Sequence, residues 1–204
     1  MGDTRAQALA RMDAALAQTH IVGLATNVQF LRQVVRSPSF VQAQLDTALI
    51  PREAAVLFRQ EPVSWTRAVA AVVAHTLHAE RRLAGADPFS QRDGWQAHGV
   101  RTRHFSFVWG ETTPQASLTY LHDGGLALQM SQGADQASGV LQFSAADRGG
   151  LWVSWDGQRT HTTLYWQGEV AHVFTPAGAA RIGLNDPLAH AGELETKGGR
   201  LTAP

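Results

Sequence analysis

Cysteine is absent from this chain of 204 residues, and neither sign of charge predominates. Without cysteine the chain has no disulfide, no thiolate nucleophile and no zinc site built on thiolates. Its 17 Lys and Arg residues are balanced by 17 Asp and Glu residues, so it lacks the basic excess typical of nucleic-acid-binding proteins. The N-terminus has no apolar core of the kind that signal peptides carry. We therefore expect a globular cytoplasmic protein with no nucleic-acid partner and no membrane partner.

Residues 64–84 predict one long helix with no wet face. The large apolar residues recur at helical spacing, and alanines fill most of the opposite side. Nothing between residues 68 and 79 is charged unless His75 or His78 is protonated. At about 1.5 Å per residue this run extends for only about 18 Å, which is short of the roughly 30 Å core of a bilayer. Protein is therefore expected to surround the helix; an amphipathic helix lying on one face of a sheet is the alternative.

From residue 100 onward the apolar pattern changes to a period of two, which is typical of strands. Turn residues separate about eight strand candidates, at 100–109, 115–122, 126–131, 137–143, 151–155, 159–166, 170–175 and 180–184. Such short connections require antiparallel neighbours. About eight antiparallel strands can close into a barrel, which removes the exposed sheet edges. The predicted fold class is α+β, with short N-terminal helices followed by an antiparallel β-barrel around one long central helix.

The first 61 residues predict four short helices, at 4–18, 28–36, 40–45 and a last one near 51–58 with Pro51 in its first turn. Leu9, Met12 and Leu16, with two alanines, form the expected buried stripe of the first helix. Four such helices have too little core to stand as an ordinary domain. We expect residues 1–61 to end a larger domain, 62–190 to form the helix-plus-barrel domain and 191–204 to be a linker.

The sequence contains no motif that predicts catalysis. It lacks HExxH, GxSxG and GxxxxGK[ST], and its nine histidines are scattered. His75 and His78, with Glu80 nearby, are the best candidates for a metal site. Histidines whose ring nitrogens bind neighbouring protein groups or water are far commoner than metal ligands. We therefore predict no catalytic, cofactor-binding or metal-ligating residue. Residues 86–98 carry two large aromatic side chains, which either fold back onto the domain or contact a partner.

The first 50 residues carry a specific pattern that resembles the C-terminal end of a biotin carboxylase domain. A helix with Arg-Met near its middle is followed by G-x-x-T-N-x-x-F-L and then by F-x-x-x-x-x-D-T-x-x-I. In this chain the matching positions are Arg11, Met12, Gly23, Thr26, Asn27, Phe30, Leu31, Phe40, Asp46, Thr47 and Ile50. The segment from Gly198 to Pro204 is similar to the place where a biotinyl domain begins.

The region between these landmarks resembles the mediating (BT) domain of acyl-CoA carboxylase α subunits, whose fold is an antiparallel barrel around a long helix. The junction with Asp87-Pro88-Phe89-Ser90 and Gly94-Trp95 is most like that of methylcrotonyl-CoA carboxylases, with propionyl-CoA and geranyl-CoA carboxylases as close relatives. The resemblance implies a ligase of leucine degradation whose full-length subunit uses biotin, ATP and Mg or Mn. No position here matches the ATP-grasp site or the biotinyl lysine, so no cofactor is expected in this region.

The resemblance implies a non-catalytic region that docks the biotin carboxylase onto the carboxyltransferase β subunit and contacts other α-subunit domains. Pro88, Phe89 and Trp95 are the predicted partner-contact residues. A β-barrel that binds one small apolar ligand is the alternative from a different functional class.

Overall fold

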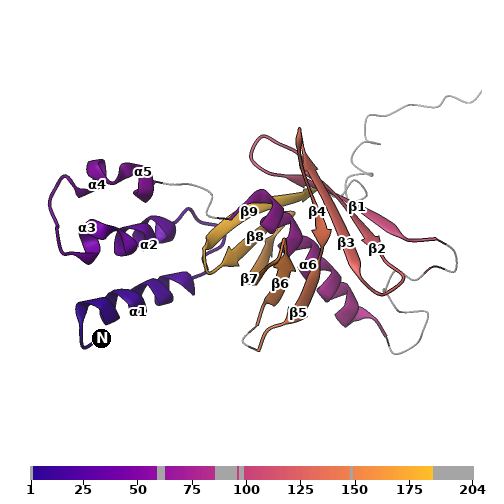
Figure 1. The fold of residues 1–204 in the computed structure, drawn as a ribbon, viewed down its shortest axis with the longest axis horizontal. Helices are drawn as coiled ribbons and strands as arrows, with labels where there is room; N and C mark the ends of the chain where they lie inside the picture. Colours follow the sequence, from indigo (N-terminus) through magenta and orange to yellow (C-terminus); the bar gives the residue numbers. More distant parts are fainter. Residues whose placement is uncertain (1, 59–62, 86–95, 97–98, 148, 186–204) are drawn as a thin grey trace, which may run out of the picture.

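The computed structural model describes residues 2–58, 63–85, 96, 99–147 and 149–185 (Figure 1). A group of short helices lies beside a strongly curved sheet, and one long helix runs against that sheet. The predicted break at 59–62, the predicted linker 191–204 and the residues Pro88, Phe89 and Trp95 lie outside the described residues. Within the described residues, no helix is both long and apolar enough to cross a lipid bilayer.

The N-terminal region begins with two antiparallel helices and continues in single helical turns. The helices are α1 (Arg5–Ala17), α2 (Val28–Arg36), α3 (Pro38–Val41), α4 (Leu49–Arg52) and α5 (Ala54–Leu57). Thr4 caps α1 by accepting a hydrogen bond from the Gln7 amide at 3.3 Å. Ser37 ends α2, and its side chain caps α3 by accepting from the Phe40 amide.

Three details of the helical prediction are wrong. The third helix begins at Pro38, because proline is compatible with the first helical position, and it ends before Ala43, whose φ is +60°. The predicted fourth helix is two separate turns, α4 and α5, on either side of Glu53. No residue of α1 is buried, and Met12 is 47% exposed; of the helices in the described chain, α1 packs mainly against α2, so much of its apolar stripe faces solvent.

Helix α6 (Trp65–Leu83) is the most buried helix in the described chain. Ser64 caps its N-terminus, and Arg81 and Arg82 in its last turn complement the helix dipole. Its buried residues are Ala68, Val69, Ala70, Ala71, Val72, Val73, Ala74 and Leu77. The whole run from 68 to 74 is thus removed from water, as the absence of charge in this stretch requires.

The sheet is nine-stranded, antiparallel and nearly closed. Its strands are β1 (Thr102–Val108), β2 (Gln115–Tyr120), β3 (Leu126–Gln132), β4 (Asp135–Val140), β5 (Gln142–Ala145), β6 (Leu151–Trp155), β7 (Gln158–Gln167), β8 (Val170–Thr175) and β9 (Gly178–Asn185). The strand order is β4-β3-β2-β1-β9-β8-β7-β6-β5. The observed architecture confirms the α+β class and the barrel-like antiparallel sheet.

The two edge strands, β4 and β5, are consecutive in the chain and are separated only by Leu141. Leu141 is buried, and its amide donates to the Leu126 carbonyl at 2.8 Å. The single strand predicted at 137–143 is therefore bent at Leu141 and belongs to both edges, which accounts for nine strands where about eight were expected. The Trp155 ring lies against the position of Gly139, so a bulky side chain fills the space where the edges meet.

The β6–β7 hairpin turns on Asp156 and Gly157, whose φ angles are +50° and +67°. Positive φ at both central residues defines a type I′ turn, whose twist matches that of the two strands. The Asp-Gly pair in the sequence is the usual signature of this turn.

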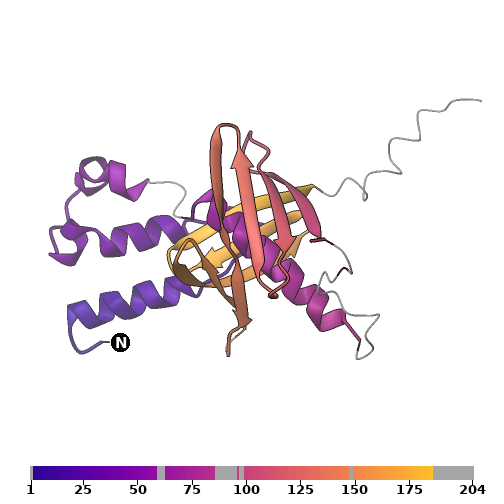
Figure 2. The same cartoon turned by 45° about the vertical axis from the view of Figure 1, so that its right-hand side comes forward.

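Helix α6 runs between the β1–β4 part and the β5–β9 part of the sheet (Figure 2). One hydrophobic cluster contains its buried side chains together with Phe107 of β1, Leu118 of β2, Leu128 of β3, Val153 of β6 and Val173 of β8. The alanines on α6 allow strands to approach the helix from several directions. The core between helix and sheet is consequently filled by side chains of both.

Replacing Ala71 by Leu should destabilise the protein, because the new side chain has no space in this core. We expect a loss of about 1–3 kcal/mol in the free energy of unfolding, measured by urea denaturation. Ala79→Leu, at an exposed position of the same helix, is the matched control and should change stability by less than about 0.5 kcal/mol. Equal effects of the two substitutions would contradict the burial described here.

Candidate functional site

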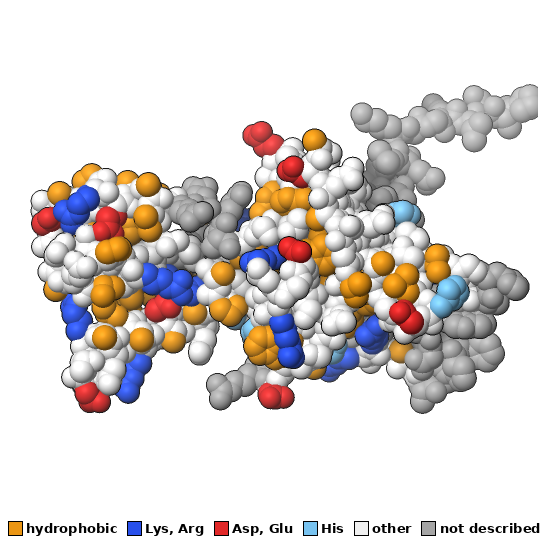
Figure 3. All heavy atoms as spheres, in the orientation of Figure 1, with side chains coloured by type: hydrophobic (Ala, Val, Ile, Leu, Met, Phe, Trp, Pro, Cys, Tyr) orange, Lys and Arg blue, Asp and Glu red, His pale blue; other side chains and the backbone are white. Residues whose placement is uncertain are grey.

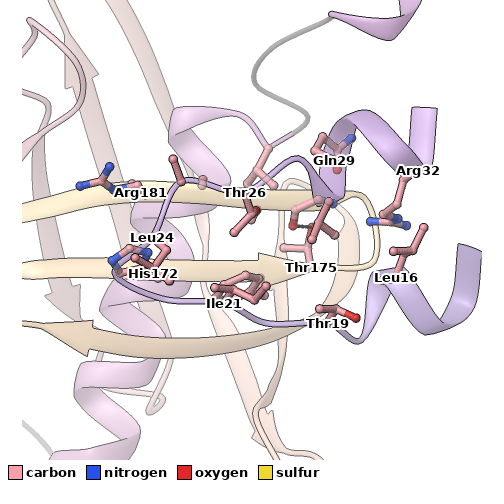
Figure 4. A pocket seen from close by; sticks show the side chains of 18 of the residues that line it. Leu16, Thr19, Ile21, Leu24, Thr26, Gln29, Arg32, His172, Thr175 and Arg181 are labelled. Atoms are coloured by element: carbon pink, nitrogen blue, oxygen red, sulfur yellow. Dashed lines mark hydrogen bonds between the residues drawn. The ribbon is translucent and has the colours of Figure 1, made fainter. Parts of the chain in front are cut away.

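A cavity of about 490 Å³ separates the helical region from strands β8 and β9. Figure 4 shows its wall, in which the segment between α1 and α2 crosses over the two strands. One side carries Leu16, Ile21 and Leu24, and the other side carries His172, Thr175 and Arg181. Residues far apart in the sequence meet here, so the cavity marks the junction between the two parts of the chain.

Arg32 is the charged residue that holds this junction together. Its side chain comes from α2 and is almost fully buried, with only 3% of the residue exposed. Its Nε atom lies 3.2 Å from Asp13 of α1, and its Nη2 atom donates to the Pro176 carbonyl of the β8–β9 turn at 2.6 Å. One guanidinium thus joins α1, α2 and the barrel.

Asp13 is shared by two arginines. Burial by itself would raise the pKa of this carboxyl, but hydrogen bonds and charges from Arg36 and Arg32 outweigh it, so the pKa lies below its ordinary value. Asp13 therefore remains ionised at neutral pH and compensates the buried charge of Arg32. Arg36 Nη2 lies 2.7 Å from Asp13 Oδ2, but the Arg36 side chain is half exposed. Its ion pair therefore contributes less to stability than the pair that Arg32 forms.

His20 adds an aromatic contact to the junction. Its ring stacks on Phe174 of β8 with a centroid distance of 4.3 Å and meets the edge of Tyr165 of β7. Burial, with a smaller effect of the charge on His161, lowers the pKa of His20. The imidazole is neutral at physiological pH and acts here as an aromatic surface.

The sequence analysis did not single out Arg32. The signal was available, because residues 28, 32 and 35 share one face of a helix, and a charged residue at the centre of an apolar face is unusual. Its partner in the β8–β9 turn lies 144 residues away, and no local pattern identifies such a contact.

The candidate metal ligands of the sequence take other contacts among the described residues. No group of three or more His, Asp and Glu side chains among them could hold a metal ion, and His75 and His78 take separate contacts. His78 meets the Phe143 ring edge-on, and Glu80 forms an ion pair with Arg103 at 2.7 Å. The predicted metal-site candidates are thus used in packing.

His75 is a partly buried, neutral histidine. Its Nε2 atom lies 3.0 Å from Thr162 Oγ1, and the Thr162 hydroxyl donates to the Leu151 carbonyl at 3.2 Å. Since that hydroxyl has one proton, His75 Nε2–H is the donor in this chain of hydrogen bonds. Burial lowers the pKa of His75 to about 4, because the charged form would be poorly solvated.

The end of the barrel at the C-terminus of α6 exposes apolar side chains. Leu83, Val100 and Leu121 are all exposed there. The Glu80–Arg103 ion pair brings α6 to the start of β1, and the Tyr120 amide donates to the Arg101 carbonyl at 2.9 Å, so the three residues lie at one end. We call them the α6 C-terminal patch. Figure 3 shows hydrophobic side chains at this end, beside the residues that are not described. Pro88, Phe89 and Trp95 belong to the segment that connects Leu83 to Val100 in the chain.

By its architecture the protein is a helical region joined by a buried arginine to a nearly closed antiparallel barrel. Residues 1–52 match the family model described as the biotin carboxylase C-terminal domain. This match covers α1 to α4 and confirms the resemblance predicted from the motifs.

The match to a known protein extends beyond this region. The chain is 23% identical over 194 residues, 90% of its length, to methylcrotonoyl-CoA carboxylase subunit alpha, mitochondrial, of Mus musculus. The aligned part is 27% of that protein, so the chain spans about a quarter of the relative's length. The first 52 residues are thus similar to the C-terminal domain of biotin carboxylase, and most of the chain is similar to part of a methylcrotonoyl-CoA carboxylase α subunit.

Replacing Arg32 by Met should destabilise the protein by about 3 kcal/mol, because it removes the buried half of an ion pair and the donor to the Pro176 carbonyl. Arg36→Met is the matched control, since Arg36 binds the same carboxylate but is half exposed, and it should cost less than about 1 kcal/mol. Thermal and urea denaturation of both variants test this difference. Similar losses would show that Arg32 has no special role at the junction.

Stability should fall as the pH is lowered from 7.5 to 5, and His75 should account for much of the loss. Its folded-state pKa is about 4 and its ordinary value is 6.5, so between these values the unfolded chain binds the proton and the folded chain does not. The expected contribution is about 2 kcal/mol by pH 5. His75→Gln keeps a hydrogen-bond donor and cannot titrate. Urea denaturation at both pH values should therefore show a smaller loss for this variant than for the wild type, and parallel curves would contradict the assignment.

Proposed function

We propose that this region is a docking module that holds a biotin carboxylase against the carboxyltransferase β subunit of an acyl-CoA carboxylase, most closely a methylcrotonyl-CoA carboxylase. The relationship to the α subunit of methylcrotonoyl-CoA carboxylase supports this proposal. The observation that carries it is the combination of a packed core with an exposed apolar patch. Helix α6 occupies the space between the two parts of the sheet, so binding has to use the outside of the barrel.

The physical need for such a module follows from how a tethered group reacts at two sites. A tether raises the effective concentration of its group only when both sites lie within its reach. A rigid body between the two enzymes sets that distance. The buried Arg32 contacts to Asp13 and Pro176 hold the biotin carboxylase-like helices in a defined position on the barrel, as this role requires.

The α6 C-terminal patch is the proposed contact surface for the β subunit. Leu83, Val100 and Leu121 supply exposed apolar area there, and apolar patches of this kind mark interaction sites. Pro88, Phe89 and Trp95, in the connection between Leu83 and Val100, are proposed to belong to the same surface. The compartment and the cofactors of the full-length subunit, biotin, ATP and Mg or Mn, remain predictions from the resemblance.

The alternative of a ligand held inside the barrel has less support. Side chains of α6 and of strands from both parts of the sheet fill the core between them, and the junction cavity lies outside this core, between the helical region and strands β8 and β9.

Val100→Ser should weaken the complex with the carboxyltransferase β subunit, because it removes apolar surface from the α6 C-terminal patch. Val108→Ser is the control: Val108 lies near the other end of β1 and is equally exposed, at 46% against 47% for Val100. Sedimentation velocity of mixtures with the purified β subunit should show a several-fold loss of affinity for Val100→Ser only. Phe89→Ala with Trp95→Ala should weaken the complex more than it lowers the melting temperature.

The wild-type chain should co-sediment with the β subunit under the same conditions. Failure of the folded wild-type chain to co-sediment would falsify the docking proposal. Binding that both valine substitutions weaken equally would retain docking but move the contact surface away from the α6 C-terminal patch.

A further inference from the structure

The junction cavity lies between two layers of the protein. Its floor is the outward face of β8 and β9, and its roof is the segment between α1 and α2, which crosses over these strands (Figure 4). Two pairs of opposite residues belong to this floor, His172 with Arg181 and Phe174 with Ala179. The volume of about 490 Å³ is in the range of small-molecule sites, which occur preferentially where two parts of a chain meet.

Contacts at three points hold the roof and the floor in a fixed relation. Arg32 of α2 donates to the carbonyl in the β8–β9 turn at 2.6 Å. The His20 ring stacks on Phe174 with a centroid distance of 4.3 Å. Gly23 lies so close to Gln167 that an added Cβ would come within 3.1 Å of the amide nitrogen. The cavity is therefore preformed, which lowers the entropic cost of binding a ligand.

The walls of this cavity favour an anion. Arg181 and His172 line the floor, Arg32 lines one end, and none of the described lining residues is Asp or Glu. Asp13 compensates the charge of Arg32, whereas Arg181 forms no ion pair within the described residues. Arg181 is also exposed. The uncompensated positive charge of the cavity is therefore that of Arg181.

His172 adds a hydrogen-bond acceptor beside this cation. The residue is only 7% exposed. Its Nε2 atom lies 3.3 Å from Gln167 Oε1, and Nε2 carries the proton because an amide oxygen can only accept. Burial and, to a smaller extent, the charge of Arg181 lower the pKa of His172, so its ring is neutral at physiological pH. The Nδ1 atom is then an acceptor, and within the described residues it has no hydrogen-bond partner.

We infer that the junction cavity binds a 2-hydroxy carboxylate with a small apolar body. His172 and Arg181 lie directly opposite each other on neighbouring antiparallel strands, which places their Cβ atoms about 4.5–5.5 Å apart. A carboxylate and a hydroxyl on adjacent carbon atoms match this spacing. The carboxylate accepts charge-assisted hydrogen bonds from Arg181, and the hydroxyl donates to His172 Nδ1. The apolar body lies between Ile21 and Leu24 of the roof and Phe174 of the floor. This site is independent of the proposed docking function, because it does not include the α6 C-terminal patch.

Isothermal titration of this chain with 3-phenyllactate, a 2-hydroxy carboxylate, tests the inference. We expect this probe to bind with one-to-one stoichiometry. The analogue 3-phenylpropanoate lacks only the hydroxyl and should bind about tenfold more weakly, because His172 Nδ1 then has no donor. The amino alcohol 1-amino-3-phenylpropan-2-ol keeps the hydroxyl but carries an ammonium group in place of the carboxylate. It should bind at least about tenfold more weakly, because the Arg181 charge repels it.

Two matched pairs of substitutions test the place of binding. Arg181→Gln should lower the affinity for 3-phenyllactate about tenfold. Arg159→Gln is its control, since Arg159 is an exposed arginine of β7 that does not line this cavity, and it should bind as the wild type does. Ala179→Trp fills the cavity from an exposed position of β9 and should abolish binding. Ala127→Trp, on β3, should not change it.

The inference is overturned if 3-phenyllactate does not bind, or if either analogue binds as tightly. Equal affinities of Arg181→Gln and Arg159→Gln would also overturn it. Binding by an Ala179→Trp variant that circular dichroism shows to be folded would place the ligand outside the junction cavity, with the same consequence. Should Ala179→Trp not fold, the comparison of the two arginine variants decides. None of these outcomes affects the docking proposal, which is tested by binding of the β subunit.

Discussion

The uncharged middle of α6 has to remain out of water, and this constraint organises the rest of the protein. Residues 68–74 are all buried, alanines and valines alike. A helix with no wet face is stable only where protein covers it on several sides. The curved sheet provides that cover, and the bend at Leu141 lets one strand contribute to both edges of the nearly closed barrel. The packing of helix and sheet is therefore mutual, since each covers apolar surface of the other.

Because side chains fill the core, a partner or ligand has to bind on the outside of the barrel. At the end of α6 near its C-terminus, apolar side chains face solvent. At the side, β8 and β9 meet the helical region across the junction cavity. The filled core and these outer surfaces are compatible with the docking function proposed above.

The junction depends on a charge that is expensive to bury. Burial removes the Arg32 guanidinium from water, which costs free energy. The ion pair with Asp13 and the hydrogen bond to the Pro176 carbonyl offset this cost. Apolar contacts would hold the two parts together over a range of orientations, whereas directional hydrogen bonds from one guanidinium define an angle as well as a distance. The relative orientation of helices and barrel is consequently a specified property of the fold.

The amino-acid sequence determined the elements whose signals are local. The long helix was predicted at 64–84 and lies at 65–83. Apart from the strand at 137–143, which is two strands, the period-two strands occur near where they were expected. The biotin carboxylase motif was readable in the first 50 residues. The local signals were weaker in the segment of single helical turns, so the bounds of α3, α4 and α5 differ from the prediction. The apolar stripe of α1 was wrongly expected to be buried. The Arg32–Pro176 contact and the neutral state of His75 were decided by the tertiary structure alone. They join residues tens of positions or more apart, and only the packing of α2 and α6 against the sheet brings such residues together.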